Sequence, residues 1–504
     1  KDSLVSSPDL AHIAYVAKRG SEAWVVVDGV EGKHYQDIPA GAFTERGRPR
    51  EIVFSPDGRR IAYVVSRDGR YFVVVDGVEG AAFEMIGVGA PVFSPDSKRV
   101  AYVATQDGKE RVVVDGVEDK PYNYITISPI RFSPDGLHMA YSGRRGKSDF
   151  VILDGKEIAQ ADSAGPVYFS DNGKRMAFKV TRGEERRVVV DGVEGRPYES
   201  LSNQILFSPD GKHVLYRATL NGYQMMVLDG TESKLKGVIS ENDFGFSPRG
   251  GAAYILRDRT GYRVVIDEIA SKSYDRIIGE PWFARDGSRV AFAAGLERRQ
   301  FVVIDGAEMD AFDEIKLRVS FSPDGKRYCY AATRAGIQYA IIDGVAAPYE
   351  AVQDVLLSPN GKHTAVVGKR SGKWTVALDG VSSKAYDDGI TACRFSLDGE
   401  HIAYVAAKGK RQFVIADGIE GTLYDNIGDL SFVGGKQVVY VAERGGKRLA
   451  VVDGVESGEY DSLTIARDQE DWGRGSPGGI DASMQLRFLA VRSGEYLRVK
   501  IKGF

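Results

Sequence analysis

The side chains best suited to acid–base or metal chemistry are six histidines, and five of them occupy one position of a repeating pattern. His12, His138, His213, His363 and His401 each stand just before a run of the type Ile-Ala-Tyr. Other copies of the pattern carry arginine at this position: Arg60, Arg99, Arg175, Arg289 and Arg327. A position that accepts imidazole or guanidinium alike is typical of a solvated polar surface. We therefore expect no histidine-dependent hydrolase and no histidine metal site.

Aspartate is the second chemical candidate, because Val-Asp-Gly or a close variant recurs twelve times. Its aspartates are Asp28, Asp76, Asp115, Asp154, Asp191, Asp229, Asp267, Asp305, Asp343, Asp379, Asp417 and Asp453. Such repetition favours a role in backbone geometry, since aspartate bonds nearby amides and glycine accepts positive φ. No Asp-x-Asp-x-Asp-Gly calcium loop occurs. The sequence therefore predicts no metal and no cofactor.

Three further reactive side chains also fit structural roles. Cys329 replaces the small alanine of an Ile-Ala-Tyr run, and Cys393 lies beside Phe395 in a predicted strand. We expect both thiols to be buried. His34 stands where sister copies carry proline or alanine, so it is interpreted as a loop residue.

The elements that position these residues follow from the repeat itself. Successive Val-Asp-Gly aspartates are 36 to 39 residues apart after a first step of 48, and Phe-Ser-Pro-Asp-Gly runs in phase with them. One copy predicts strand A at 52–55, strand B at 60–65, strand C at 71–75 and strand D at 83–86, with turns at 56–58, 67–69 and 76–80. Strands B and C are nearly continuous apolar runs, which indicates burial on both faces.

Four short antiparallel strands about every 38 residues are typical of a β-propeller blade. The sequence predicts an all-β fold of 12–13 such blades. A single propeller usually has four to eight blades, so we expect two tandem six- or seven-bladed propellers, residues 1–240 and 241–504. One oversized ring is the alternative.

The block Phe-Ser-Pro-Asp-Gly-Lys/Arg-x-Ile/Val-Ala-Tyr, at 54–63, 93–102 and 321–330, resembles the WD40-like (PD40) propeller repeat. That family includes the TolB propeller and the propellers of prolyl-oligopeptidase-type enzymes. The resemblance implies a periplasmic or secreted protein. The Val-Asp-Gly-Val-Glu-Gly element departs from the TolB third strand, and no Gly-x-Ser-x-Gly elbow occurs, so peptidase activity is not implied.

Composition narrows the classes of partner. The formal net charge is −3, which predicts no nucleic-acid partner, and no apolar run approaches the ~18 residues of a membrane span. The chain begins at Lys1, as a mature chain does after loss of a signal peptide and as a trimmed chain also does. The B–C hairpins are rich in Lys and Arg and the C–D turns in Asp and Glu, which predicts a basic rim opposite an acidic rim.

Residues that interrupt a repeat are better functional candidates than residues that maintain it. Two insertions, 42–48 and 468–475, contain Phe43, Arg46, Trp472 and Arg474. Trp282 interrupts a strand A. The basic hairpins contribute further candidates for partner binding: Arg144, Arg145, Arg298 and Arg299.

The sequence therefore favours a non-catalytic scaffold that mediates protein–protein assembly, with an anionic surface or a glycan as other possible ligands. An enzyme with an axial site of lyase or lactonase type is the alternative. A third hypothesis is glycan binding through Trp24, Trp282, Trp374 or Trp472.

Overall fold

The computed structural model describes residues 4–9, 11–39, 52–87, 91–125, 130–239, 243–433, 435–465, 487–492 and 495–500. In these ranges the regular secondary structure consists of β-strands. The chain divides into two compact units, Lys1–Glu241 (unit 1) and Asn242–Phe504 (unit 2), and each is described by itself. That each unit closes into its own ring stays a prediction.

One blade shows how the repeat folds. In blade 2, β5 (Ile52–Phe54), β6 (Ile61–Arg67), β7 (Arg70–Val75) and β8 (Val78–Glu79) pair antiparallel in chain order. These are strands A to D, so D is a free sheet edge. Val73 and Val74 of strand C point to opposite faces and are 1% and 0% exposed. Both faces of the sheet are therefore buried, as predicted.

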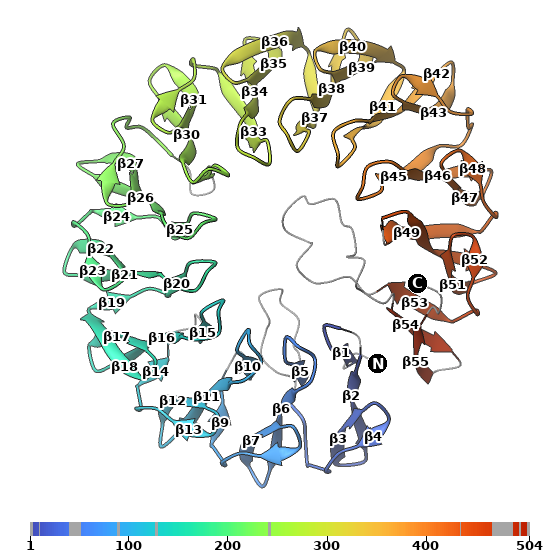
Figure 1. Cartoon of the computed structure of the whole chain (residues 1–504). Helices are drawn as coiled ribbons and strands as arrows, with labels where there is room; N and C mark the ends of the chain where they lie inside the picture. Colours follow the sequence, from blue (N-terminus) through green and yellow to red (C-terminus); the bar gives the residue numbers. More distant parts are fainter. Residues whose placement is uncertain are drawn as a thin grey trace. The chain divides into compact units, whose positions relative to one another are not determined.

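Unit 1 holds blades 1 to 6, which stack side by side in chain order (Figure 1). Besides blade 2, its strands are β1 (Val5–Ser6), β2 (Ile13–Arg19), β3 (Glu22–Val27) and β4 (Val30–Glu31); β9 (Met85–Ile86), β10 (Val92–Phe93), β11 (Val100–Gln106), β12 (Lys109–Val114) and β13 (Val117–Glu118); β14 (Tyr124–Ile125), β15 (Arg131–Phe132), β16 (Met139–Arg145), β17 (Ser148–Leu153) and β18 (Lys156–Ala161); β19 (Ser163–Ala164), β20 (Tyr168–Phe169), β21 (Met176–Arg182), β22 (Glu185–Val190) and β23 (Val193–Glu194); and β24 (Ser200–Leu201), β25 (Leu206–Phe207), β26 (Val214–Leu220), β27 (Tyr223–Leu228) and β28 (Thr231–Glu232).

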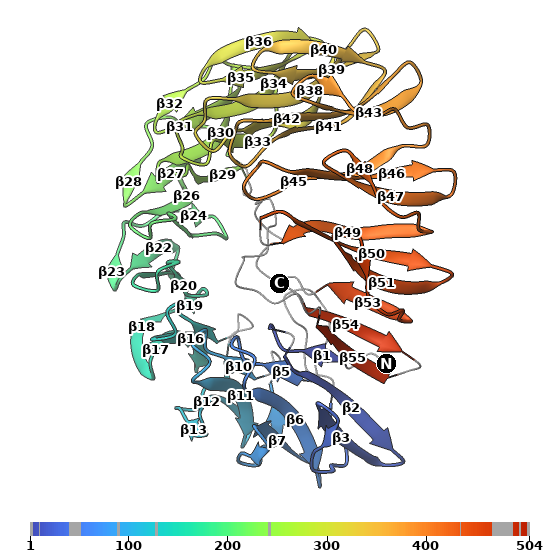
Figure 2. The same ribbon diagram turned by 45° about the vertical axis from the view of Figure 1, so that its right-hand side comes forward.

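Unit 2 holds blades 7 to 12 and a last three-stranded sheet. Figure 2 shows its neighbouring sheets, such as β41–β44 and β45–β48, stacked face to face. Its strands are β29 (Phe244–Phe246), β30 (Ala252–Asp258), β31 (Gly261–Ile266) and β32 (Ile269–Ala270); β33 (Arg276–Phe283), β34 (Val290–Leu296), β35 (Arg299–Ile304) and β36 (Ala307–Phe312); β37 (Glu314–Phe321), β38 (Tyr328–Arg334), β39 (Ile337–Ile342) and β40 (Val345–Tyr349); β41 (Ala351–Leu357), β42 (Thr364–Arg370), β43 (Lys373–Leu378) and β44 (Val381–Ser382); β45 (Ile390–Phe395), β46 (Ile402–Lys408), β47 (Arg411–Ala416) and β48 (Ile419–Glu420); β49 (Asn426–Val433), β50 (Gln437–Arg444), β51 (Lys447–Val452) and β52 (Val455–Glu456); and β53 (Ser462–Ile465), β54 (Arg487–Arg492) and β55 (Glu495–Lys500).

The C–D connection is tighter than predicted. Asp76 and Gly77 have φ of 52° and 83°, and Val75 pairs with Val78 on either side of them. This is a two-residue hairpin turn of the primed type, which requires positive φ at both central positions. All twelve Val-Asp-Gly aspartates have positive φ, between 46° and 52°. The predicted five-residue turn at 76–80 is therefore wrong, because strand D starts directly after glycine.

The predicted strand D at 83–86 is also wrong. Phe83 forms only an isolated bridge with Tyr71, whereas Met85–Ile86 pairs with β11 of the next blade. The segment thus leaves the free edge of one sheet. It then forms the first piece of strand A in the next sheet, where it pairs with strand B. In blades 3 to 6 strand A is split into two short pieces, and in blade 8 it runs unbroken as β33 with a bulge.

The apolar core lies between the faces of neighbouring sheets. Ala62 and Val73 of blade 2 pack with Tyr102 and Val113 of blade 3 in one cluster of buried side chains. No helix long and apolar enough to span a membrane occurs in the part of the chain that the structure describes.

Candidate functional site

The five repeat histidines hold the hairpins of their own blades. His363 Nδ1 lies 2.6 Å from Asp379 Oδ2, while Asp379 Oδ1 accepts a hydrogen bond from the Thr364 amide at 2.8 Å. The other four histidines make the same contact with their turn aspartates at 2.6 to 2.7 Å. The hydrogen bond to Asp379 raises the pKa of His363 above its usual value. These histidines and aspartates therefore complete a structural turn.

The two cysteines and His34 also pack against neighbouring side chains. Cys329 and Cys393 are 1% and 4% exposed, and burial raises the pKa of each thiol to about 12. A protonated buried thiol is a poor nucleophile. His34 stacks on Trp24, with ring centroids 4.2 Å apart, rather than only filling a loop.

Neighbouring blades are joined by a recurring polar contact that we call the latch. Between blades 1 and 2, Glu79 accepts a hydrogen bond from Tyr35 Oη at 3.0 Å. Lys33 Nζ lies 2.5 Å from Glu79, and Arg67 of the same blade approaches it at 3.3 Å. The latch residues stand at fixed offsets from the turn aspartates: lysine at +5 and tyrosine at +7 in one blade, glutamate at +3 and arginine at −9 in the next.

The latch recurs, in whole or in part, along both units. Blades 3 and 4 repeat it fully with Lys120, Tyr122, Glu157 and Arg145. The partial forms centre on a glutamate that keeps one or two of the three contacts, with Arg196 in the place of the lysine at Glu232: Glu194, Glu232, Glu308, Glu420 and Glu456. Glu118 instead pairs with Arg111 of its own blade, which is not a latch position.

The latch is dismantled between blades 8 and 9. Ala346 of β40 stands at the glutamate position, Asp310 of β36 at the lysine position, and Phe312 at the tyrosine position. Arg334, at the arginine position, has no carboxylate partner among the described residues. Its guanidinium instead lies over the rings of Phe312 and Tyr339, 4.9 and 5.3 Å from their centroids.

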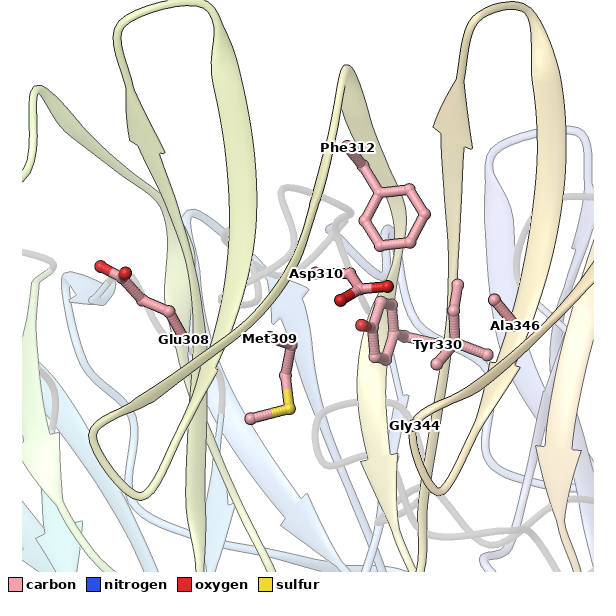
Figure 3. A pocket seen from close by; sticks show the side chains of 8 residues that line it. Glu308, Met309, Asp310, Phe312, Tyr330, Gly344 and Ala346 are labelled. Carbon is pink, nitrogen blue, oxygen red and sulfur yellow. The ribbon is translucent and has the colours of Figure 1, made fainter.

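A cavity of about 280 Å³ occupies this altered interface. It is lined by Glu308, Met309, Asp310, Phe312, Tyr330, Ile341, Gly344 and Ala346. Figure 3 shows the carboxyl group of Asp310 between the rings of Phe312 and Tyr330, with the carboxyl group of Glu308 turned away from them. Glu308 is occupied elsewhere, because it accepts from Tyr274 Oη at 3.0 Å and pairs with Lys272 at 3.1 Å.

Two polar groups of the cavity lack partners. Asp310 is exposed and forms no ion pair within the described ranges. Tyr330 is 2% exposed, and its hydroxyl makes no hydrogen bond to the residues that the structure describes. Burial, with smaller contributions from Tyr328 and then from the Asp310 charge, raises the pKa of Tyr330 well above its usual range. The equivalent Tyr141 in blade 4 donates to Asp119 at 2.6 Å.

The next interface, between blades 9 and 10, also lacks the glutamate. Ser382 stands in its place. Arg370 lies over the ring of Tyr349, 3.9 Å from its centroid, and forms no ion pair within the described part of the chain. Two consecutive interfaces of unit 2 thus keep the latch arginine and have lost its acid.

The predicted site residues have different outcomes. Arg144 bonds Asp149 at 2.5 Å, and Arg145 binds Glu157 through two contacts of 2.8 and 3.1 Å. Both guanidinium groups therefore make contacts within blade 4, and their role in partner binding stays a prediction. Arg298 and Arg299 are exposed at the B–C hairpin of blade 8.

Trp282 is half-buried and packs against a core cluster that contains Ala291 and Tyr330. It therefore fills space between blades, and its role in partner binding stays a prediction. Phe43, Arg46, Trp472 and Arg474 lie outside the described residues, so their role stays a prediction.

The predicted basic rim opposite an acidic rim is wrong in its simple form. Arg145, at the end of strand B, reaches Glu157 beyond the C–D turn. Acidic side chains also cap the B–C hairpins from the preceding blade: Asp162 accepts from the Gly183 amide at 2.7 Å, and Asp425 from the Gly445 amide at 2.7 Å. Charges of opposite sign are therefore mixed at the hairpin end of the blades.

Within the described ranges, no group of three or more His, Cys, Asp or Glu side chains is placed so that it could hold a metal ion. The altered latch was not found from the sequence. Its signal was present, however: alignment on the turn aspartates places Ala346, Asp310 and Phe312 at positions where several other copies carry glutamate, lysine and tyrosine, although Ala270 of blade 7 also stands at the glutamate position.

No family model matches the chain, and no curated protein matches it. Among solved structures it is similar to a eukaryotic initiation factor, with 12% identity, TM-score 0.32, and coverage of 65% of this chain and 96% of that chain. It is also similar to the GH74 enzyme of Niastella koreensis, with 14% identity, TM-score 0.27, and coverage of 99% and 90%. A third is KlHsv2 with loop 6CD replaced by a Gly-Ser linker, with 13% identity, TM-score 0.23, and coverage of 50% and 92%. These likenesses concern the fold alone. The chain is an all-β protein of about twelve four-stranded antiparallel propeller blades.

Proposed function

We propose that the protein is a non-catalytic β-propeller scaffold that binds a protein partner at blades 8 to 10 of unit 2. The observation that carries this proposal is the loss of the latch glutamate at two consecutive interfaces, at Ala346 and Ser382, while Arg334 and Arg370 remain. Each loss removes a stabilising contact between blades. Departures from a locally consistent pattern that weaken a fold are expected at functional sites.

Exposed arginine side chains near blades 8 to 10 also favour a protein-binding site in this part of unit 2. Arg298 and Arg299 belong to the B–C hairpin of blade 8 and Arg370 ends strand B of blade 10, whereas Arg334 of blade 9 is half-buried against two rings. Arginine is enriched where proteins bind one another, because its planar group stacks and forms several hydrogen bonds.

The described residues give little support to the competing functions. Trp24 is 4% exposed, and Trp282 and Trp374 are partly buried against core clusters, so burial reduces the ring surface that a sugar could contact. The five repeat histidines are paired with turn aspartates and His34 stacks on Trp24, which gives little support to an enzyme of lyase or lactonase type that needs a histidine base. A periplasmic or extracellular location is part of the proposal and is supported by the PD40 resemblance.

Co-purification from the native source, identified by mass spectrometry, tests the proposal. The full chain is compared with a latch-restoring variant, Asp310→Lys with Ala346→Glu, and with Phe83→Tyr, which restores a latch tyrosine between blades 2 and 3. We expect one protein partner with the unchanged chain and with Phe83→Tyr, and its loss from the latch-restoring variant. Equal recovery with all three chains would contradict the site. A stoichiometric metal that is required for turnover would contradict the scaffold.

A further inference from the structure

The cavity between blades 8 and 9 has the chemistry of a cation site. Its unneutralised charge is the carboxylate of Asp310, and two aromatic rings, Phe312 and Tyr330, which meet edge-to-face with centroids 6.4 Å apart, lie beside that carboxylate (Figure 3). Aromatic faces attract cations, and a carboxylate adds a charge-assisted hydrogen bond. The hydroxyl of Tyr330, a side chain that is 2% exposed, supplies an additional acceptor that no described residue uses.

The position of Arg334 does not reverse this charge preference. Arg334 stacks on Phe312 and Tyr339 but is not among the residues that line the cavity. Asp310 is among the groups that raise the pKa of Tyr330, after burial and the neighbouring Tyr328. The unpaired carboxylate of Asp310 therefore makes the cavity more favourable for a cation than for an anion.

The size of the cavity limits what can enter. Sites for small molecules and cofactors usually measure about 300 to 1,000 Å³. At about 280 Å³ this cavity suits one long side chain better than a whole metabolite.

The cavity lies beside free sheet edges. Strand D of blades 8 and 9 is a regular strand of six and five residues, β36 and β40, where blade 2 has two residues. Each is the last strand of its sheet, so its outer backbone groups have no strand partner in the described structure. Such an edge can pair with an extended chain, whose side chains then enter adjacent pockets.

Resting on the proposed function, we infer that this cavity anchors a lysine or arginine side chain carried by an extended segment of the protein partner. The cationic head lies between Asp310 and the rings of Phe312 and Tyr330. The methylene stem contacts Met309 and Ile341, and the segment backbone pairs with the free edge of β36 or β40.

Labelled pentapeptides of sequence acetyl-Thr-Val-X-Val-Thr-amide, with X as Lys, Arg, norleucine or Glu, test the inference by fluorescence anisotropy on the full chain. We expect the Lys and Arg peptides to bind at least tenfold more tightly than the norleucine peptide. The Glu peptide should bind more weakly still. Tighter binding of the Glu peptide would overturn the inference.

Two single variants are expected to change the affinity for the Lys peptide in opposite directions. A general loss of folding would weaken binding in both, so it cannot produce this result. Asp310→Asn should weaken the Lys peptide about tenfold, because a charge-assisted contact becomes neutral. Arg334→Gln should strengthen it, because a nearby like charge is removed. Glu280→Gln, at an exposed acid of β33, is the matched control and should change nothing. Unchanged affinity in Asp310→Asn, or weaker binding in Arg334→Gln, would overturn the inference.

Free n-butylammonium tests whether the cavity binds a lysine or arginine side chain of a peptide segment or simply any small organic cation. It should displace the labelled Lys peptide only at concentrations at least tenfold above those of the unlabelled peptide; equal potency would overturn docking of an extended segment. If none of the four peptides binds, the cation site is rejected. If the latch-restoring variant still loses a protein partner in the co-purification, the proposed scaffold function is retained.

Discussion

The hydroxyl group of Tyr35 donates a hydrogen bond of 3.0 Å to the carboxylate of Glu79 in the next blade, 44 residues further along the chain. Tyr35 is 4% exposed, so this contact is made largely away from water. The same pair recurs as Tyr122 with Glu157 and as Tyr424 with Glu456. Stacking of blades therefore depends on a polar contact as well as on apolar packing.

Removal of this hydroxyl should weaken the stack. We expect Tyr35→Phe to lower the free energy of unfolding by about 1 to 2 kcal/mol, because Glu79 loses one partner that is shielded from water. Urea unfolding of the full chain measures the change. Tyr223→Phe, at a side chain that is 59% exposed, is the control and should stay within about 0.5 kcal/mol. Equal effects of the two substitutions would show that the latch adds no stability.

A second prediction concerns the glycine of the Phe-Ser-Pro-Asp-Gly turn. Gly58 has φ of +73°, and an added Cβ would lie 2.7 Å from Asp9 Oδ1 of blade 1. That oxygen is held by Ser7 Oγ at 2.6 Å and by the Ala11 amide at 2.9 Å, so it cannot easily move. Gly58→Ala should therefore combine backbone strain with a clash between blades.

Gly69 provides the matched control, because it has the same φ of +73° and open space around an added Cβ. Gly69→Ala should cost about 1 to 2 kcal/mol through the left-handed backbone alone. Gly58→Ala should cost about 1 to 3 kcal/mol more through the clash. Thermal unfolding of both variants measures the difference, and equal losses would show that blades 1 and 2 do not touch at this turn.

A third prediction concerns pH. Burial raises the pKa of Asp354 in β41 above its usual value of about 3.9. The hydrogen bond from the Val355 amide and the charge of Arg394 lower this pKa, but burial has the larger effect. The folded state therefore holds this proton more tightly than the unfolded state does. Stability should fall as the pH rises from the unfolded pKa through the folded pKa, and the full penalty is present at neutral pH.

Asp354→Asn should remove that penalty while keeping the acceptor for the Val355 amide. We expect a higher midpoint of urea unfolding than in the unchanged chain at pH 7.5, and no difference at pH 3.5, where both side chains are neutral. Glu280→Gln serves as the exposed control and should show no such pH-dependent gain. A variant that is less stable at pH 7.5 would show that the charged carboxylate is favourable in the fold.

The repeat made much of the fold readable from the sequence, because its turns are encoded by a few adjacent residues. Asp76-Gly77 supplies two positive φ angles, and Val75 and Val78 flank them as a cross-strand pair. The path of Met85–Ile86 could not be predicted in the same way. Its hydrogen-bond partners belong to β11 of the next blade, and local residue preferences do not specify which sheet edge an isolated dipeptide will join.

The sequence by itself determined the repeating unit and its antiparallel B–C hairpin, since these depend on turns formed by neighbouring residues. The tertiary structure alone showed that Ala346, Asp310 and Phe312 meet at one interface and that a cavity lies there. Asp310 and Phe312 belong to blade 8 and Ala346 to blade 9. Their contact exists only when the two sheets stack, so the physical meaning of these three substitutions becomes visible only in the folded chain.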